Sequence, residues 1–161
     1  QPFITYHVLG HELYHSLFWK HSPTLLTLYS HRGECVMDHY QNSCGKKMQG
    51  ACKSGKKTFT EDAPDIEALR LLYAILRENY RPEQLSAQID GLDTTLEQSF
   101  FYYTASVCGV KQTDQSEHQA ERDPHSAGNI RVNAAVSLMP EFSRAFQCKE
   151  GDPMFIDEKD S

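Results

Sequence analysis

The sequence predicts a mainly α-helical chain with one modest hydrophobic core. Apolar residues recur at helical spacing in several segments, prolines stand at the borders of those segments, and there is little of the alternation typical of strands. With 161 residues, of which 39% are hydrophobic, the chain can bury one core of ordinary size and not two. We therefore expect residues 1–161 to form one helical unit.

The first predicted helix covers residues 3–20. Pro2 suits a first helical turn because proline has no N–H to donate, and Pro23 ends the helix for the same reason. The apolar positions of this segment include Ile4, Val8, Leu13 and Leu17. Their spacing favours a helix.

Five further helices are expected downstream. Ser22 and Pro23 make a good cap for a helix through Tyr40, before a loop rich in glycine and lysine. The next helix begins near Glu61 and stops before Pro82. The remaining helices are expected at 94–108, 128–138 and 141–147, and the polar stretch 111–123 is expected to be an exposed loop. In the 94–108 helix we expect one aromatic and aliphatic stripe in the core, formed by Leu96, Phe100, Tyr103 and Val107.

Charge and hydropathy exclude some classes of function. The net charge of −6 argues against a nucleic-acid partner, since no basic stripe is available to neutralise phosphates. The basic stretch GKKMQGACKSGKK has no apolar period and is expected to be a solvated loop. No apolar run approaches the roughly 20 residues that cross a bilayer, and no signal peptide is visible.

The string HELYH, from His11 to His15, is the most informative motif. On a helix, residues four apart share a face, so both rings can direct a nitrogen at one zinc ion roughly 2.0–2.1 Å away. The Glu12 carboxylate can then accept a proton from the water that attacks the substrate. The motif predicts a zinc site that cuts amide bonds without a covalent intermediate.

A catalytic zinc ion generally takes three protein ligands, so the motif lacks one donor. His21 is one candidate, because it follows His15 at the spacing of the pattern HExxHxxGxxH. Phe18, however, stands where that pattern needs glycine for a sharp turn. Glu61 is the other candidate, and we prefer it.

Asp65 supports the choice of Glu61, because it lies four residues further on the same helical face. Asp65 can accept a hydrogen bond from a ligand histidine, which fixes the tautomer and raises the basicity of that histidine. Pro64 fits only within a first helical turn, which predicts Glu61 at or near the N-cap and the metal close to a helix start. The alternative is that Glu61, Asp62 and Asp65 are only acidic residues that a first turn favours through the helix macrodipole.

Four blocks of the sequence, in order, resemble the C-terminal part of the neprilysin family of zinc metallopeptidases, which includes the endothelin-converting enzymes. These blocks are HVLGHELYH, TEDAPD, VCGV and DPHSAGNIRVNAAVSLMPEFSRAFQC. The resemblance runs through nearly the whole chain. It implies a helical, gluzincin-type zinc peptidase catalytic subdomain, residues 1–161 being the C-terminal catalytic segment of a larger two-lobed enzyme whose upstream lobe is absent.

The resemblance also implies a role for each site residue. It makes His11, His15 and Glu61 the zinc ligands, Glu12 the general base and Asp65 the residue that orients a ligand histidine.

By the same resemblance, His125 stabilises the oxyanion and Arg131 binds the substrate backbone. On position alone, His125 is a surface histidine in a turn and Arg131 belongs to a helix-surface ion pair. The chain departs from the family at Phe18, where an aspartate is usual, and in EDAPD, which replaces ENxAD. His7 is expected to be a packed neighbour of His11 and not a fourth ligand.

Five cysteines cannot all pair within the chain, so at least one is free or bonds outside it. Cys44 and Cys52 flank a loop and could close a local ring. The resemblance implies that Cys108 and Cys148 bond to the upstream lobe and Cys35 to a missing tail. An intracellular protein with reduced cysteines is the alternative.

Together these observations predict a zinc metalloendopeptidase that binds one catalytic Zn²⁺ ion and cleaves peptides or small polypeptides. It is expected to be extracellular, either secreted or the ectodomain of a membrane-anchored enzyme, with its N-terminal lobe as a partner and any membrane anchor outside this sequence. The alternative is an inactive neprilysin-like binding module that keeps the fold and the zinc. Phe18 and the absent lobe favour that alternative.

Overall fold

The computed structural model describes residues 2–20, 33–43, 55–108 and 123–157. Within these residues the labelled helices are α1 (Pro2–Lys20), α3 (Gly55–Asn79), α4 (Pro82–Leu85), α5 (Leu96–Cys108), α7 (Gly128–Ser137) and α8 (Pro140–Ala145). A further helix covers residues 33–43. Strand pairing in the same residues is limited to one isolated bridge between Gln88 and Thr95. The prediction of a mainly α-helical chain is therefore confirmed.

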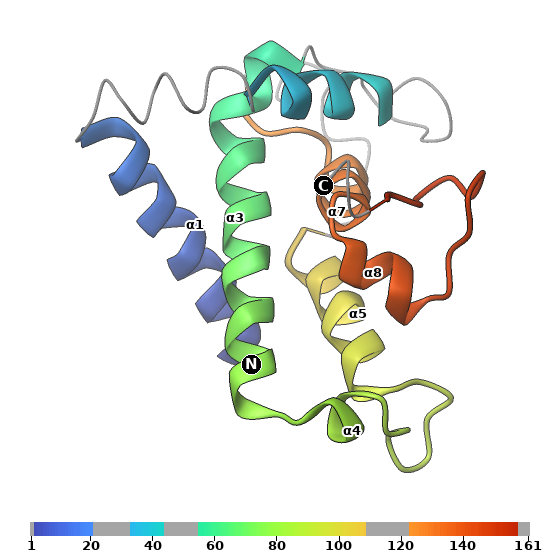
Figure 1. Ribbon diagram of the computed structural model, residues 1–161. Helices are drawn as coiled ribbons and strands as arrows, with labels where there is room; N and C mark the ends of the chain where they lie inside the picture. The colour runs from blue at the N-terminus through green and yellow to red at the C-terminus, as the bar shows by residue number, and fades with distance from the viewer. Residues whose placement is uncertain (1, 21–32, 44–54, 109–122, 158–161) are drawn as a thin grey trace, which may run out of the picture.

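The long helix α3 stands at the centre of the molecule, with α1 along one side and α5, α7 and α8 on the other (Figure 1). Both α1 and α7 contact α3, and α5 contacts α1, α7 and α8. The 33–43 helix crosses the start of α3, where a Cβ atom on Gly55 would lie only 2.2 Å from the Met37 carbonyl oxygen. Glycine at this position is what allows the two backbones to approach so closely.

The hydrophobic core lies between α3, α5, α7 and the residues that follow α7. Leu69 is completely buried, and Met139 is 1% exposed. Around them, Phe101 forms edge contacts with Phe100 and Phe142, with ring centroids 5.2 and 5.3 Å apart. Aromatic edge contacts of this kind add to the free energy gained by burying the rings.

The predicted core stripe of α5 is only partly correct. Phe100 is buried, but Tyr103 is 60% exposed. Phe100 and Phe101 are adjacent and both are buried, so the buried face of α5 is centred between them. The buried face of α5 therefore points away from Tyr103. The side chain of Val107 lies outside the described residues.

The apolar positions of α1 also lie differently from a simple amphipathic helix. Val8, Leu13 and Leu17 are 46%, 52% and 50% exposed. The side chains that α1 buries against α3 are instead polar, with His7 3% and His11 7% exposed. The face of α1 that packs against α3 therefore carries histidines, while Val8, Leu13 and Leu17 lie on exposed faces.

The prediction that Pro64 limits the start of its helix is wrong. Helix α3 begins at Gly55, has no acidic residue in its first turn and contains Pro64 in its interior. Glu61 is therefore not an N-cap residue, and the macrodipole alternative for the acidic residues no longer applies. An interior proline removes one helical hydrogen bond and costs roughly 3 kcal/mol, but Pro64 is fully buried and its packing offsets part of that cost.

Several other boundaries agree with the predictions. The first helix, the end of the third before Pro82, and the helices α5, α7 and α8 lie within a few residues of their expected positions. The cap at Ser22, the glycine and lysine loop, the loop over 111–122 and the Cys44–Cys52 ring lie outside the described residues. In the described part of the chain, every helix is too short or too polar to cross a membrane.

Candidate metal centre

The candidate metal centre lies between α1 and α3, beside a close contact of the two helices. A Cβ atom on Gly10 would lie 3.2 Å from the Ala68 Cβ, so two small residues allow this approach. His11 and His15 project from α1 beside this contact, and Glu61 and Asp65 project from α3 toward them. The helical spacing of four residues on each side therefore places four functional groups around one point.

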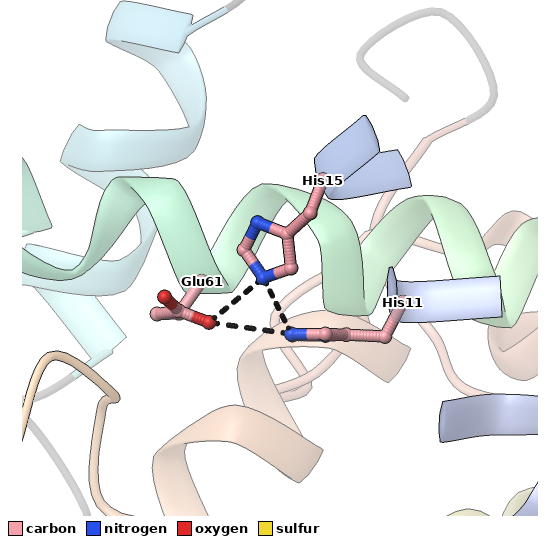
Figure 2. A group of neighbouring side chains, drawn as sticks. All are labelled: His11, His15 and Glu61. Atoms are coloured by element: carbon pink, nitrogen blue, oxygen red, sulfur yellow. Dashed lines mark hydrogen bonds and ion pairs between the residues drawn. The ribbon is translucent and has the colours of Figure 1, made fainter. Parts of the chain in front are cut away.

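His11, His15 and Glu61 direct one atom each at that point (Figure 2). The His11 and His15 Nε2 atoms are 2.9 Å apart, and Glu61 Oε2 lies 3.2 Å from the first and 3.1 Å from the second. In the described residues these three side chains form the one group whose donor atoms lie close enough together to hold a metal ion.

The donor set fits zinc. Two ligands about 2.05 Å from a tetrahedral ion are about 3.3 Å apart, close to the three separations observed. His11 Nδ1 lies 2.7 Å from Asp65 Oδ1, so Nδ1 carries the proton and Nε2 presents a lone pair. The lone pairs of the two imidazoles and of the carboxylate point at one place, where they repel one another unless a cation or a proton lies between them. A single cation there attracts all three ligand atoms at once.

Asp65 orients His11 and is itself held by Arg131. The Arg131 guanidinium donates from Nε to Asp65 Oδ2 at 2.6 Å and from Nη2 to Oδ1 at 2.8 Å. Burial alone would raise the pKa of Asp65, but the hydrogen bonds from His11 and Arg131 outweigh it and lower the pKa to about 2. Burial likewise opposes protonation of His11, yet the hydrogen bond and charge of Asp65 raise its pKa, which makes its ring a stronger donor to a metal.

His125 reaches the same centre from the loop before α7. Its Nε2 lies 3.1 Å from Glu61 Oε2, and its Nδ1 lies 2.6 Å from Asp123 Oδ1. The backbone N–H of His125 also donates to Asp123 Oδ1, at 2.9 Å. Asp123 therefore fixes both the ring and the backbone of His125. Asp123 was not among the predicted site residues, although its place two residues before His125 is visible in the sequence.

Asp62 is the other buried acid of α3. Its Oδ2 accepts hydrogen bonds from Thr58 Oγ1 at 2.6 Å and from Ser126 Oγ at 3.0 Å. Burial raises the pKa of Asp62 to about 7 in spite of these two bonds. Asp62, Thr58 and Ser126 were not among the residues predicted for the metal site.

The predicted residues are thus brought together to different degrees. His11, His15, Glu61, Asp65 and His125 are in direct contact, and Arg131 joins them through Asp65 and not through a surface ion pair. Glu12 follows His11 on α1 with an exposed side chain. His7 is buried beside His11, and burial lowers its pKa, as expected for a packed neighbour.

Two further predictions are left open by the structure. The competing donor His21 and the side chain of Phe18 lie outside the described residues. Cys35 and Cys148 are free within the described residues, and the side chains of the other three cysteines are outside them, so the disulfide pairing stays a prediction.

The chain matches known proteins of the family that its sequence motifs resemble. Residues 5–161 match the model of peptidase family M13. Neprilysin-3 of Drosophila melanogaster is 31% identical over 94% of this chain, and human endothelin-converting enzyme 1 is 28% identical over 91%. The chain spans about a fifth of the length of these relatives, 21% and 20% respectively.

The fold has a counterpart among solved structures. The zinc metalloprotease Zmp1 of Mycobacterium tuberculosis, in its open state, superposes on 99% of this chain with a TM-score of 0.70 at 23% sequence identity. The matched region is 28% of the Zmp1 chain. The expected fold class, a helical gluzincin-type segment, is therefore confirmed. On the family match over residues 5–161, this chain belongs to peptidase family M13, the neprilysin and endothelin-converting enzyme family.

Proposed function

We propose that residues 1–161 carry the catalytic segment of a zinc-dependent metalloendopeptidase that hydrolyses peptides or small polypeptides. The observation that supports it best is the convergence of His11 Nε2, His15 Nε2 and Glu61 Oε2 within 2.9–3.2 Å of one another. Because the chain spans only about a fifth of its relatives, this activity is proposed for the protein that contains it.

In this proposal His11, His15 and Glu61 hold one zinc ion, and Asp65 keeps His11 in the required tautomer. When bound, zinc supplies a Lewis acid that polarises the scissile carbonyl and lowers the pKa of a coordinated water. Glu12 accepts a proton from the attacking water and delivers it to the leaving amine. Its exposure on α1 leaves the carboxylate accessible to water and substrate.

His125 donates a hydrogen bond to the oxyanion. With Nδ1 directed at Asp123, a second proton on Nε2 makes the ring an imidazolium, which can donate from both nitrogens. Its Nε2 already faces the centre, 3.1 Å from Glu61 Oε2. A donor in this position contributes roughly 3–4 kcal/mol of transition-state stabilisation in other enzymes.

Arg131 is proposed to bind the substrate backbone. Its guanidinium is held rigidly by two hydrogen bonds to Asp65, and its side chain keeps 20% exposure. A guanidinium fixed in this way can bind a peptide carbonyl with little further loss of conformational entropy.

The proposed partners are peptide substrates and an N-terminal lobe of the same enzyme, and the proposed location is extracellular.

The test is Glu12→Gln in the full-length, zinc-loaded protein, with a fluorogenic peptide as substrate. We expect hydrolysis to fall to background while zinc content is unchanged, because glutamine keeps the shape of the side chain but cannot accept the proton. Glu78→Gln, at an exposed position late in α3, is the matched control and should cleave normally.

Two results would count against the proposal. If Glu12→Gln cleaves as well as the parent protein, the role given to Glu12 is wrong. If the parent protein binds zinc but shows no cleavage that a chelator abolishes, the chain is the inactive binding module considered above.

A further inference from the structure

Asp62 is a buried acid that the proposed chemistry does not use. Its side chain is completely inaccessible to solvent, although it follows the proposed ligand Glu61 directly in sequence. An exposed aspartate in a helix would need no explanation. A fully buried one is costly unless its oxygens receive hydrogen bonds, so its partners indicate what it does.

Both partners of Asp62 bind the same oxygen. Thr58 lies one turn earlier in α3 and donates to Oδ2 at 2.6 Å, while Ser126 donates to Oδ2 at 3.0 Å from 64 residues away in sequence. Oδ1 is buried without a hydrogen-bond partner. The Thr58 bond stays within α3 and can only fix the rotamer of Asp62. The Ser126 bond joins α3 to the loop that carries His125.

The position of Ser126 gives this bond its consequence. Ser126 follows His125 directly and precedes Ala127, whose carbonyl accepts the N–H groups of Ile130 and Arg131 at the start of α7. Asp123 holds His125 from the other side through its ring and its backbone N–H. His125 therefore lies between Asp123, which binds its ring, and Ser126, which is bonded to α3 beside Glu61.

We propose that Asp62, through its hydrogen bond from Ser126, is a positioning residue that holds the imidazole of His125 over the metal centre. This inference rests on the proposed hydrolytic function, in which His125 donates to the oxyanion. The bond ties the loop to the same helix that supplies Glu61, so the donor and the ligand keep a fixed separation. Without it, His125 would be held by Asp123, which is itself on that loop, and by its own contact with Glu61.

The chain offers a variant set that tests this directly in the full-length, zinc-loaded protein. Ser126→Ala removes the bond and leaves His125, Glu12 and all three ligands in place. We expect kcat to fall about 10- to 100-fold, as for a small displacement of a catalytic group, with KM within about twofold and zinc content unchanged. Asp62→Ala should have the same effect.

Asp62→Asn should restore most of the rate that Asp62→Ala loses. The asparagine carbonyl can occupy the place of Oδ2 and accept both hydroxyls, and its amide nitrogen then takes the place of the oxygen that has no partner. Ser86→Ala is the matched control, because the Ser86 hydroxyl bonds only to carbonyls of its own turn. It should change neither the rate nor zinc content.

A double mutant separates positioning from a general structural effect. If Asp62 and Ser126 act through His125, then Ser126→Ala should cause no further loss of kcat once His125→Ala has been made. Additive losses, a normal kcat in Ser126→Ala, or a parallel loss of zinc would each overturn the inference.

Amide hydrogen exchange over residues 123–127 gives a readout that does not need activity. We expect faster exchange at His125 and Ser126 in Ser126→Ala and in Asp62→Ala than in Ser86→Ala, and unchanged exchange would overturn the inference. If the full-length protein cleaves no peptide, the proposed function fails, and the exchange rates still decide whether Asp62 anchors the loop.

Discussion

The two halves of α3 are built on different physical principles. In its first half, beside the candidate metal centre, the helix buries acids, with Asp62 and Asp65 0% and 2% exposed. In its second half, it buries aliphatic and aromatic side chains such as Leu69 and Tyr73. The first half is held by hydrogen bonds with defined partners, and the second by apolar contact without direction.

This difference determines which substitutions each half tolerates. An apolar core accepts a new side chain of similar volume at a cost below about 1.5 kcal/mol, because dispersion contacts can be remade by small shifts. A buried polar network loses a full desolvation penalty when one partner is removed, even if the shape is kept. The first half of α3 should therefore be intolerant of isosteric changes that the second half accepts.

The largest effect should come from removing a proposed ligand in the polar first half of α3. Glu61→Ala is expected to lower zinc affinity by at least about 1,000-fold, because losing a partner one step further from the metal already costs roughly 10–100-fold. His21→Ala should leave the affinity unchanged. Competition with a zinc-binding dye measures both. A large loss in His21→Ala with a small one in Glu61→Ala would restore the three-histidine alternative.

An isosteric pair on α3 tests the comparison itself. Asp65→Asn keeps the shape but removes the charge that Arg131 and His11 require, so we expect a loss of about 3 kcal/mol in the free energy of unfolding. That is the low end for breaking a buried ion pair, because the Arg131 side chain keeps 20% exposure. Leu69→Met, one helical turn along, should cost less than about 1.5 kcal/mol.

Urea unfolding of the zinc-free chain measures this pair without any contribution from the metal. Equal losses in the two variants, or a larger loss in Leu69→Met, would show that the two halves of α3 do not differ in their tolerance of isosteric changes.

A smaller effect is expected at a polar group outside α3, where the 33–43 helix meets α7. His39, on the 33–43 helix, has its Nε2 3.1 Å from the Ala134 carbonyl and 2.9 Å from Ser137 Oγ. Burial lowers the pKa of His39 in the folded chain. The folded state therefore binds fewer protons than the unfolded state below about pH 6.5, and this contribution to stability is full above that pH and lost as the pH falls through the folded value.

His39→Gln removes this titration and keeps an N–H donor for the carbonyl. Its free energy of unfolding, measured in chelator between pH 8 and pH 5, should fall less steeply than that of the parent chain. Parallel curves for the two proteins would contradict the assignment.

The sequence predicted the helices well because their signals are local. Prolines, caps and apolar spacing mark the ends of α1, α5, α7 and α8. The same local rules failed at Pro64, which lies in the interior of α3 because tertiary packing offsets the missing hydrogen bond. They also failed for the face of α1, where the partners of the histidines decide which side is buried.

The site was predictable where a side chain carries recognisable chemistry at a recognisable spacing. His11, His15, Glu61 and Asp65 fall in this class, since two pairs four residues apart identify two helical faces. Ser126 does not, because a hydroxyl that donates to a buried acid far along the chain has no distinctive spacing. Its proposed role depends on a contact between residues 62 and 126, which only the folded chain brings together.

The close approach of Gly10 to Ala68 has a consequence for ion selectivity. The three proposed ligand atoms belong to two separate helices, so the distances between them depend on the separation of α1 and α3. Zinc takes bonds of about 2.0–2.2 Å from nitrogen and oxygen, whereas calcium takes about 2.3–2.6 Å from oxygen. Gly10 and Ala68 have no functional group, but by setting the helix separation they influence which cation fits the proposed site.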